Sequence, residues 1–304
     1  MDQQITIFLG SFALVGFLLK TLILFNVEIK SRIAESFVVL CIFFIVQNVA
    51  EFLGYVTYFR SLGSEQSVAL GQFFIHIYMI ALYFIFPSVL LLALALTDSP
   101  LFNKARRVLY SISLGLTLAQ LGGFVIAGFD YVGWTVITQP GSLYWLGMLY
   151  ILSCAGATLV HLVYQYHVNK DYAVRFNCKV NLIAFAPLFA VAFGVLFLRA
   201  AGFNSSSAIS LPLATIAFLF IMLLHTNGNL FWLTTKFKTV LAVLLMNRDA
   251  SVDEIIGRIE KLRIEEALKV TNGQQKNAAA LINLPPSTLN KKIAKYAIEV
   301  SRSS

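Results

Sequence analysis

Eight polar side chains near the C-terminal end of the chain have the types and spacing that suit contact with nucleic acid. They are Lys276, Asn277, Ser287, Thr288, Asn290, Lys291, Lys292 and Lys295. Between Ala267 and Ile298 the chain has five lysines and no acidic residue. Lysine ammonium groups neutralise phosphates, and hydroxyl and amide side chains bond both phosphates and base edges. The sequence therefore predicts that this stretch contacts duplex DNA.

A second polar set lies inside apolar stretches closer to the N-terminus. Its members are Gln47, Asn48, Glu51, Gln72, His76, Gln120 and Arg199. Ionisable residues inside a bilayer cost about 2.5 kcal/mol or more each at its centre, and they often mark functional sites. The set predicts a site for an unidentified small-molecule or protein signal, centred on Glu51, His76 and Arg199. The alternative is that these side chains only bond helices to one another.

No residue pattern in the chain predicts catalysis or a cofactor. No cluster of histidine, cysteine and aspartate has metal-ligand spacing, and no nucleophile stands beside a base. The three cysteines, Cys41, Cys154 and Cys178, are expected to be small buried hydrophobes rather than a disulfide framework. We expect a protein that is not an enzyme and that holds no metal or cofactor.

The elements that must position these residues are mostly apolar helices. Hydrophobic residues make up 58% of the chain and charged residues 12%, whereas soluble proteins average about 25% charged residues. A membrane-spanning helix needs about 20 predominantly apolar residues. Seven stretches qualify, at residues 5–25, 35–58, 69–97, 108–128, 143–166, 180–201 and 208–230. The sequence predicts an all-α protein with a seven-helix bundle in a lipid bilayer.

Basic residues in alternate loops predict the orientation of this bundle. Basic residues follow the first, third and fifth stretches, and they include Lys30, Lys104 and Arg175. The loops between them hold almost none. Because loops rich in lysine and arginine stay on the cytoplasmic side, we expect the N-terminus outside and the C-terminus in the cytoplasm of a bacterial inner membrane.

The last part of the chain has the signals of a small helical domain. Ser251 followed by Asp253 and Glu254 predicts a helix start, and Asn272-Gly273 predicts its end. A short second helix is expected at 274–282, and Pro286 suits the first turn of a third. Leu289, Ile293 and Tyr296 are expected to point inward. We expect a membrane domain at 1–231, a connector helix at 232–250 and a helix-turn-helix domain at 251–304.

This pattern resembles the Fis-type helix-turn-helix, which also occurs at the C-terminus of NtrC-like activators. The resemblance covers about 262–298 and rests on Asn272-Gly273, Ala278-Ala279, Ser287-Thr288-Leu289, Lys291-Lys292 and Tyr296. It implies that the third helix enters the major groove, with Thr288 and Asn290 at bases or phosphate. It also implies that Lys291, Lys292 and Lys295 contact phosphate, and that Lys276 and Asn277 lie at the DNA backbone.

The chain departs from that family at the turn before the third helix. Pro285 and Pro286 stand where the family often has a basic or amide residue, and Asn283 replaces its usual glycine. Asn290 replaces a common arginine. No Walker motif is present, so the chain lacks the ATPase of the NtrC-like activators.

The membrane part resembles the seven-helix sensor regions at the N-terminus of some bacterial histidine kinases. The shared features are Phe86-Pro87-Ser88 followed by Leu90-Leu91-Leu92, and Gln139-Pro140-Gly141. This resemblance implies a sensor role and names no ligand.

These observations together predict a membrane-bound one-component transcription regulator that acts as a homodimer. Residues 252–262 are expected to supply the dimer seam. Two alternatives stay open at this point. The chain is a transporter or channel with a regulatory tail, or it is a membrane adaptor whose tail binds another regulator rather than DNA.

Overall fold

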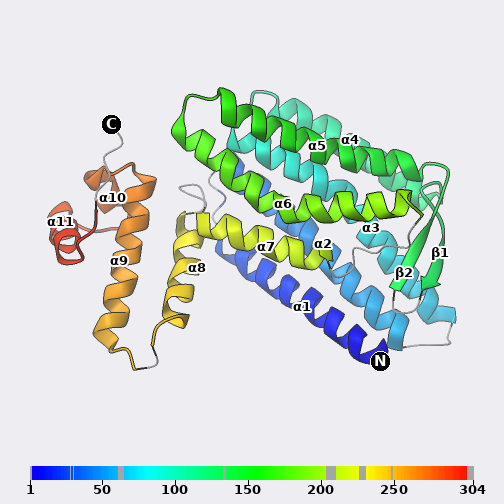
Figure 1. Cartoon of the computed structure of the whole chain (residues 1–304), viewed down its shortest axis with the longest axis horizontal. Coiled ribbons are helices and arrows are strands. Elements are labelled where there is room, and N and C mark those ends of the chain that lie inside the picture. The colour runs from blue at the N-terminus through cyan, green and yellow to red at the C-terminus, as the bar shows by residue number, and fades with distance from the viewer. Residues whose placement is uncertain are drawn as a thin grey trace. The chain divides into compact units, whose positions relative to one another are not determined.

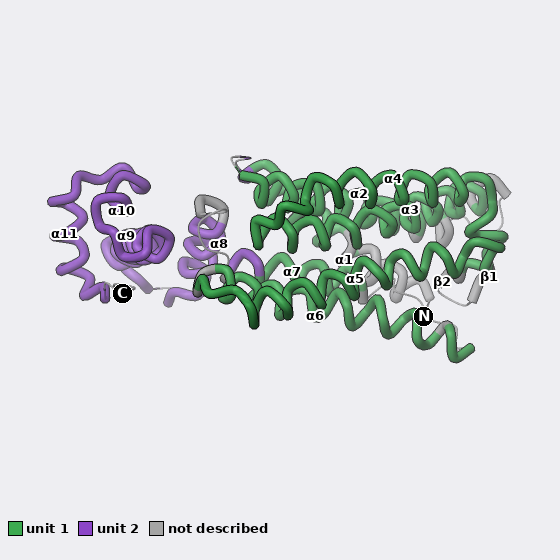
Figure 2. Tube along the Cα trace, turned by 90° about the horizontal axis from the view of Figure 1, so that it is seen from above, with its two compact units in different colours: residues 1–25, 31–221 green, residues 26–30, 222–304 purple. Residues whose placement is uncertain are grey.

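The computed structural model of the chain describes residues 2–27, 29, 31–60, 65–132, 135–202, 210–225, 231–247 and 249–299. The chain divides into two compact units (Figure 2). Unit 1 comprises Met1–Phe25 and Ser31–Ile221, and unit 2 comprises Asn26–Lys30 and Met222–Ser304.

Unit 1 is built from long apolar helices (Figure 1). They are α1 (Asp2–Asn26, whose last residue belongs to unit 2), α2 (Arg32–Arg60), α3 (Glu65–Leu96), α4 (Phe102–Leu121), α5 (Tyr144–Val168), α6 (Tyr172–Ala200) and α7 (Ser210–His225, which belongs to unit 2 from Met222 onward). Within the described residues, four helical segments are long and apolar enough to cross a membrane. These are Arg32–Gly54, Val68–Leu96, Tyr144–Val168 and Val174–Leu198, and shorter apolar helices occupy Leu14–Asn26 and Leu211–Leu224.

The prediction of an all-α fold is wrong in one place. The fourth apolar stretch was expected to stay helical to Gly128, but α4 ends at Leu121 and a two-stranded antiparallel sheet follows. Its strands are β1 (Ile126–Val132) and β2 (Thr135–Pro140). Gly123 ends the helix because it takes a positive φ of 78°. A side chain at Gly141 would collide with the carbonyl oxygen of Phe124, so glycine is required where β2 leaves the hairpin.

Helix α3 is the central element of unit 1. It packs against α2, α4, α5 and α6, and its second half, including Tyr83, Ile85 and Leu92, is buried. A helix with neighbours on all sides has apolar residues on every face. For this reason α3 shows no amphipathic pattern in the sequence.

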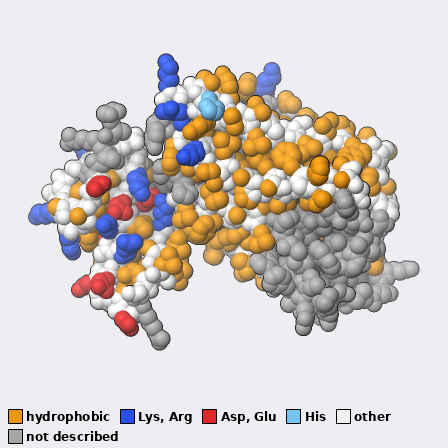
Figure 3. All heavy atoms as spheres, in the orientation of Figure 1, with side chains coloured by type: hydrophobic (Ala, Val, Ile, Leu, Met, Phe, Trp, Pro, Cys, Tyr) orange, Lys and Arg blue, Asp and Glu red, His pale blue; other side chains and the backbone are white. Residues whose placement is uncertain are grey.

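The outer surface of unit 1 is also apolar. Val108, Leu118, Leu149 and Val160 of α4 and α5 are each more than half exposed. Figure 3 shows hydrophobic side chains over most of the described surface of this bundle, with Lys and Arg side chains at a few places on it, and the Asp and Glu side chains in view lie on the C-terminal helices. Soluble monomers rarely expose apolar patches larger than a few hundred Å², so this surface is suited to lipid.

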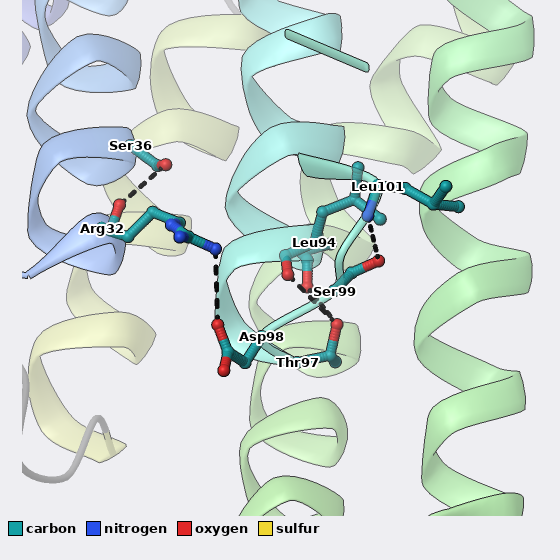
Figure 4. Close-up of polar contacts among 8 residues, drawn as sticks. Arg32, Ser36, Leu94, Thr97, Asp98, Ser99 and Leu101 are labelled. Atoms are coloured by element: carbon teal, nitrogen blue, oxygen red, sulfur yellow. Dashed lines mark hydrogen bonds and ion pairs between the residues drawn. The ribbon is translucent and has the colours of Figure 1, made fainter. Parts of the chain in front are cut away.

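Polar contacts join the ends of α2, α3 and α4 (Figure 4). Arg32 Nη1 lies 3.4 Å from Asp98 Oδ1, and Arg106 Nη1 lies 2.9 Å from Glu35 Oε1. Both guanidinium groups also lie over the Phe102 ring, at 5.3 and 5.9 Å from its centroid. Exposed ion pairs contribute about 0–1 kcal/mol each, so these pairs orient the helix ends more than they stabilise the bundle.

The described part of unit 2 contains four helices after α7. They are α8 (Phe231–Leu244), α9 (Val252–Val270), α10 (Gln275–Leu281) and α11 (Pro286–Lys295). The predicted start of α9 is confirmed, because Ser251 and Glu254 form a reciprocal capping box. The predicted end is confirmed as well, with Asn272 and Gly273 at φ of 50° and 79°. Pro286 occupies the first turn of α11, as expected.

Candidate nucleic-acid interface

A small apolar core holds α9, α10 and α11 together. Its buried residues are Ile264, Ala267, Leu268, Ala278, Ala279, Ile282, Leu289 and Ile298. Ala278 and Ala279 are fully buried, so larger side chains there would force α10 away from its neighbours. Leu289 points inward as predicted, and Ile293 and Tyr296 are partly buried against the same core. The core therefore fixes which face of α11 is left to solvent.

Most of the predicted DNA-contacting residues are exposed on α10 and α11. Lys276 and Asn277 of α10 and Ser287, Asn290, Lys291 and Lys295 of α11 are exposed, while Thr288 is half-buried. Asn277 donates to Gln274 Oε1 at 2.5 Å, which orients its amide at the start of α10. Lys295 Nζ lies 5.2 Å from the centroid of the Tyr296 ring. Exposed ammonium groups on two neighbouring helices are able to neutralise phosphates of one backbone.

Lys292 has a different environment from the other lysines. Its Nζ lies 2.6 Å from Glu260 Oε2 on α9, and the Tyr296 hydroxyl donates to the same oxygen at 2.6 Å. The resemblance to the Fis-type helix-turn-helix implies a phosphate contact for Lys292. In the structure Glu260 of α9 lies next to Lys292, so this ion pair links α11 to α9.

The Glu260 contacts shift two pKa values. Hydrogen bonds from Lys292 and Tyr296 lower the pKa of the Glu260 carboxyl below its ordinary value. The same bond to Glu260 raises the pKa of the Tyr296 hydroxyl. Because the folded-state pKa of Glu260 is depressed, its contribution to stability is present above the unfolded-state value and is lost as the pH falls through the folded-state value.

Glu260→Gln should therefore destabilise the C-terminal helices at neutral pH and have no effect in strong acid. The pair is partly exposed, so the expected loss at pH 7 is about 1 kcal/mol or less. Thermal unfolding of a segment covering residues 231–304 would measure it. The difference between parent and variant should begin to shrink as the pH falls below the ordinary glutamate pKa of about 4.3, and it should vanish only below the depressed folded-state pKa of Glu260. Glu265→Gln, whose ion pair with Lys261 is 4.0 Å long and exposed, is the control. A pH-independent difference would contradict the assignment.

The polar residues of unit 1 form two separate groups among those that the structure describes. In the first, Gln47 Nε2 donates to Glu51 Oε2 at 2.9 Å. The Oε1 atoms of both residues are buried and have no hydrogen-bond partner among the described residues. Asn48 Oδ1 accepts from Lys20, which also donates to Thr215 Oγ1 at 3.0 Å. This first group joins α1, α2 and α7.

Lys20 is a buried member of this first group. Its side chain is fully buried, with Nζ 5.6 Å from the centroid of the Phe44 ring. The group needs a close approach between α1 and α2, since a Cβ at Gly16 would lie 3.0 Å from Asn48 Nδ2. The sequence held one signal for this buried polar group. It is a single lysine inside an apolar stretch, with a glycine four residues before it.

The second group joins α3 and α4 near the hairpin. Gln120 Nε2 donates to the carbonyl oxygen of His76 at 3.0 Å. The His76 ring stands edge-on to Phe129 of β1, with centroids 5.1 Å apart. Gln72 is half-buried one turn before His76, and the side chain of Arg199 lies outside the described residues. Lys20 is a cation bonded to Asn48, which belongs to the same group as Glu51.

Among the described residues, no three histidine, cysteine, aspartate or glutamate side chains lie close enough to hold a metal ion. All three cysteines are free and buried.

Comparison with known protein families finds one similarity. Residues 255–296 match the family described as bacterial regulatory protein, Fis family. Comparisons of the chain with curated proteins and with solved structures returned no match. The similarity thus covers α10, α11 and most of α9.

Proposed function

We propose that this protein is a membrane-bound one-component transcription regulator, which couples an outer or intramembrane signal to DNA binding. The observation that carries the proposal is the combination in one chain of a Fis-family region at 255–296 with four helical segments apolar and long enough to span a bilayer. With both parts in one chain, the membrane part is able to control the DNA-binding domain directly.

In this proposal α11 is the recognition helix. Thr288 and Asn290 face bases or phosphate, and Ser287 lies in the first turn of the helix. Lys276, Lys291 and Lys295 neutralise phosphates, with Asn277 beside the DNA backbone. These residues except Thr288 are exposed on α10 and α11. We leave Lys292 out of the proposed DNA surface because its ammonium is paired with Glu260.

Residues 1–231 form the proposed sensor domain, with seven helices in a bacterial inner membrane as in the sensor regions of some histidine kinases. The apolar outer surface of α4 and α5 supports a lipid environment. The distribution of basic loops supports an outer N-terminus and a cytoplasmic C-terminus.

The proposed signal site includes the Gln47, Asn48 and Glu51 group with Lys20 and Thr215, and the His76, Gln120 and Gln72 group. The unpartnered buried Oε1 atoms of Gln47 and Glu51 support it. Buried polar groups usually have partners, so these acceptors are available to a donor supplied by a signal. Arg199 stays part of the proposed set on sequence grounds.

A homodimer completes the proposal. Val252 is 71% exposed and Ile256 is 50% exposed on one face of α9. Pairing this face with that of a second copy would remove both side chains from water.

The test uses the full-length protein in cells and has two arms. Cross-linking to chromatin, followed by sequencing, should recover discrete sites from the tagged protein. A reporter enzyme that is active only outside the cytoplasm should stay silent when it is fused after Ser304. An active reporter would overturn both the topology and the DNA function.

The same experiments separate the alternatives. Recovery of no DNA above background, from protein that is present in the membrane, would favour the adaptor. Substrate flux through reconstituted vesicles would favour a transporter or channel.

A further inference from the structure

Helix α8 carries two lysines that contact different parts of unit 2. Lys236 Nζ donates to Asn26 Oδ1, the last residue of α1, at 2.9 Å. Lys238 Nζ lies 2.9 Å from Glu266 Oε2 on α9. The two lysines are two residues apart, so they leave the helix in different directions. Helix α8 is thus bonded both to the end of α1 and to the region that resembles the Fis family.

The contact with α9 is buried. The Lys238 side chain is 16% exposed and the Glu266 side chain 5% exposed. The other Glu266 oxygen lies 3.2 Å from Lys269, so both oxygens are occupied. Removing one partner of a buried ion pair leaves an uncompensated charge away from water. The buried ion pair therefore stabilises the contact between α8 and α9.

The contact is nevertheless separate from the core that folds the C-terminal helices. All the buried and partly buried residues of that core lie between Ile264 and Ile298, on α9, α10, α11 and the turns that join them. Helix α8 contributes none of them. The core of the helix-turn-helix is therefore complete without α8.

Movement of α9 would be carried to the recognition helix. Lys292 and Tyr296 of α11 both bond to Glu260 of α9. Together with the shared core, these bonds make α11 follow α9. A line of polar contacts therefore runs from Asn26 through α8 and α9 to α11.

We propose that α8 is a two-contact clamp, formed by Lys236 with Asn26 and Lys238 with Glu266, through which the end of α1 controls DNA binding. The inference rests on the proposed function, and it assigns the regulation of that function to these four residues. The clamp couples the position of α1 to the affinity of α11 for DNA.

The test compares Lys236→Met and Lys238→Met in the full-length protein, reconstituted in lipid nanodiscs. Both variants keep every residue of the C-terminal core. Hydrogen exchange of the α8 amides should become faster in both. The Kd for a random-sequence DNA duplex should change in the same direction in both. The change should be about 5-fold or less for Lys236→Met, whose contact with Asn26 is exposed, and larger for Lys238→Met, whose ion pair is buried. Lys261→Met, which removes an exposed pair with Glu265 on α9, is the matched control and should change neither quantity.

A conservative variant provides the rescue. Lys238→Glu alone should behave like Lys238→Met, whereas Lys238→Arg keeps a cation facing Glu266 and should keep slow exchange and the parent Kd. Unchanged exchange in Lys236→Met and Lys238→Met would show that no clamp exists. Faster exchange with an unchanged Kd would show that the clamp does not control DNA binding. If the parent and all variants fail to bind DNA, the proposed function fails, while exchange still reports whether the clamp is present.

Discussion

Replacing Lys276, Lys291 and Lys295 together with alanine should nearly abolish DNA binding by the full-length protein. All three ammonium groups are exposed on α10 and α11. Each phosphate contact contributes about 0.9 to the slope of log K against log salt concentration. The triple variant should lose about 2.7 from that slope, and its affinity should fall for every duplex sequence. Titration of a fluorescent duplex at several salt concentrations would measure both quantities.

Lys292→Ala is the matched control for this prediction. Lys292 is adjacent to Lys291 in the chain, but its ammonium is paired with Glu260. The variant should keep the salt slope of the parent and should unfold at a lower temperature. If Lys292→Ala reduces the slope as much as Lys291→Ala does, the assignment of the two lysines to different surfaces is wrong.

Replacing Lys20 with methionine should change the transcription of target genes while the amount of protein in the membrane stays near normal. The substitution removes the bonds to Asn48 and Thr215 and so separates α1 from α2 and α7. Polar bonds between membrane helices contribute about 0.6 to 1.7 kcal/mol each, so the loss is roughly 1–3 kcal/mol. A shift of that size changes the balance between two conformations by about 5- to 150-fold. Transcript levels and quantitative membrane blots would measure the outcome.

Leu22→Met is the control for Lys20→Met, because Leu22 lies on the same helix and is 62% exposed. It should leave both measurements unchanged. A loss of the Lys20→Met protein from the membrane would favour the alternative in which the polar group only joins helices. Unchanged transcription at a normal protein level would place the signal site elsewhere.

The sequence predicted the C-terminal helices well because their signals are local. Ser251 and Glu254 cap α9 through contacts three residues apart, and Asn272-Gly273 ends it through backbone conformation. Pro286 fits the first turn of α11 with no help from distant residues. The inward position of Leu289 follows from helical periodicity. Each of these features depends on residues within about one turn, so one sequence is enough to reveal them.

The hairpin was missed for a different reason. Its strands occupy the end of an apolar stretch that was long enough to be read as a membrane helix. Gly122-Gly123 ends α4, but the strands are defined by pairing with each other, as in the register of Phe129 with Thr138. Apolar content by itself does not distinguish a strand from the last turns of a helix.

Chain composition and local patterns were sufficient to establish apolar helices, an exposed lysine-rich surface and the order of the C-terminal helices. They did not reveal which polar groups meet. Glu260 reaches Lys292 across 32 positions of sequence, Lys20 reaches Thr215 across 195, and Lys236 reaches Asn26 across 210. Such pairs depend on how helices pack, and the packing is set by many apolar contacts that have no individual signature in the sequence. The three-dimensional arrangement pairs Lys292 with Glu260, on which its proposed structural role rests, and it places Lys20 in a buried polar group.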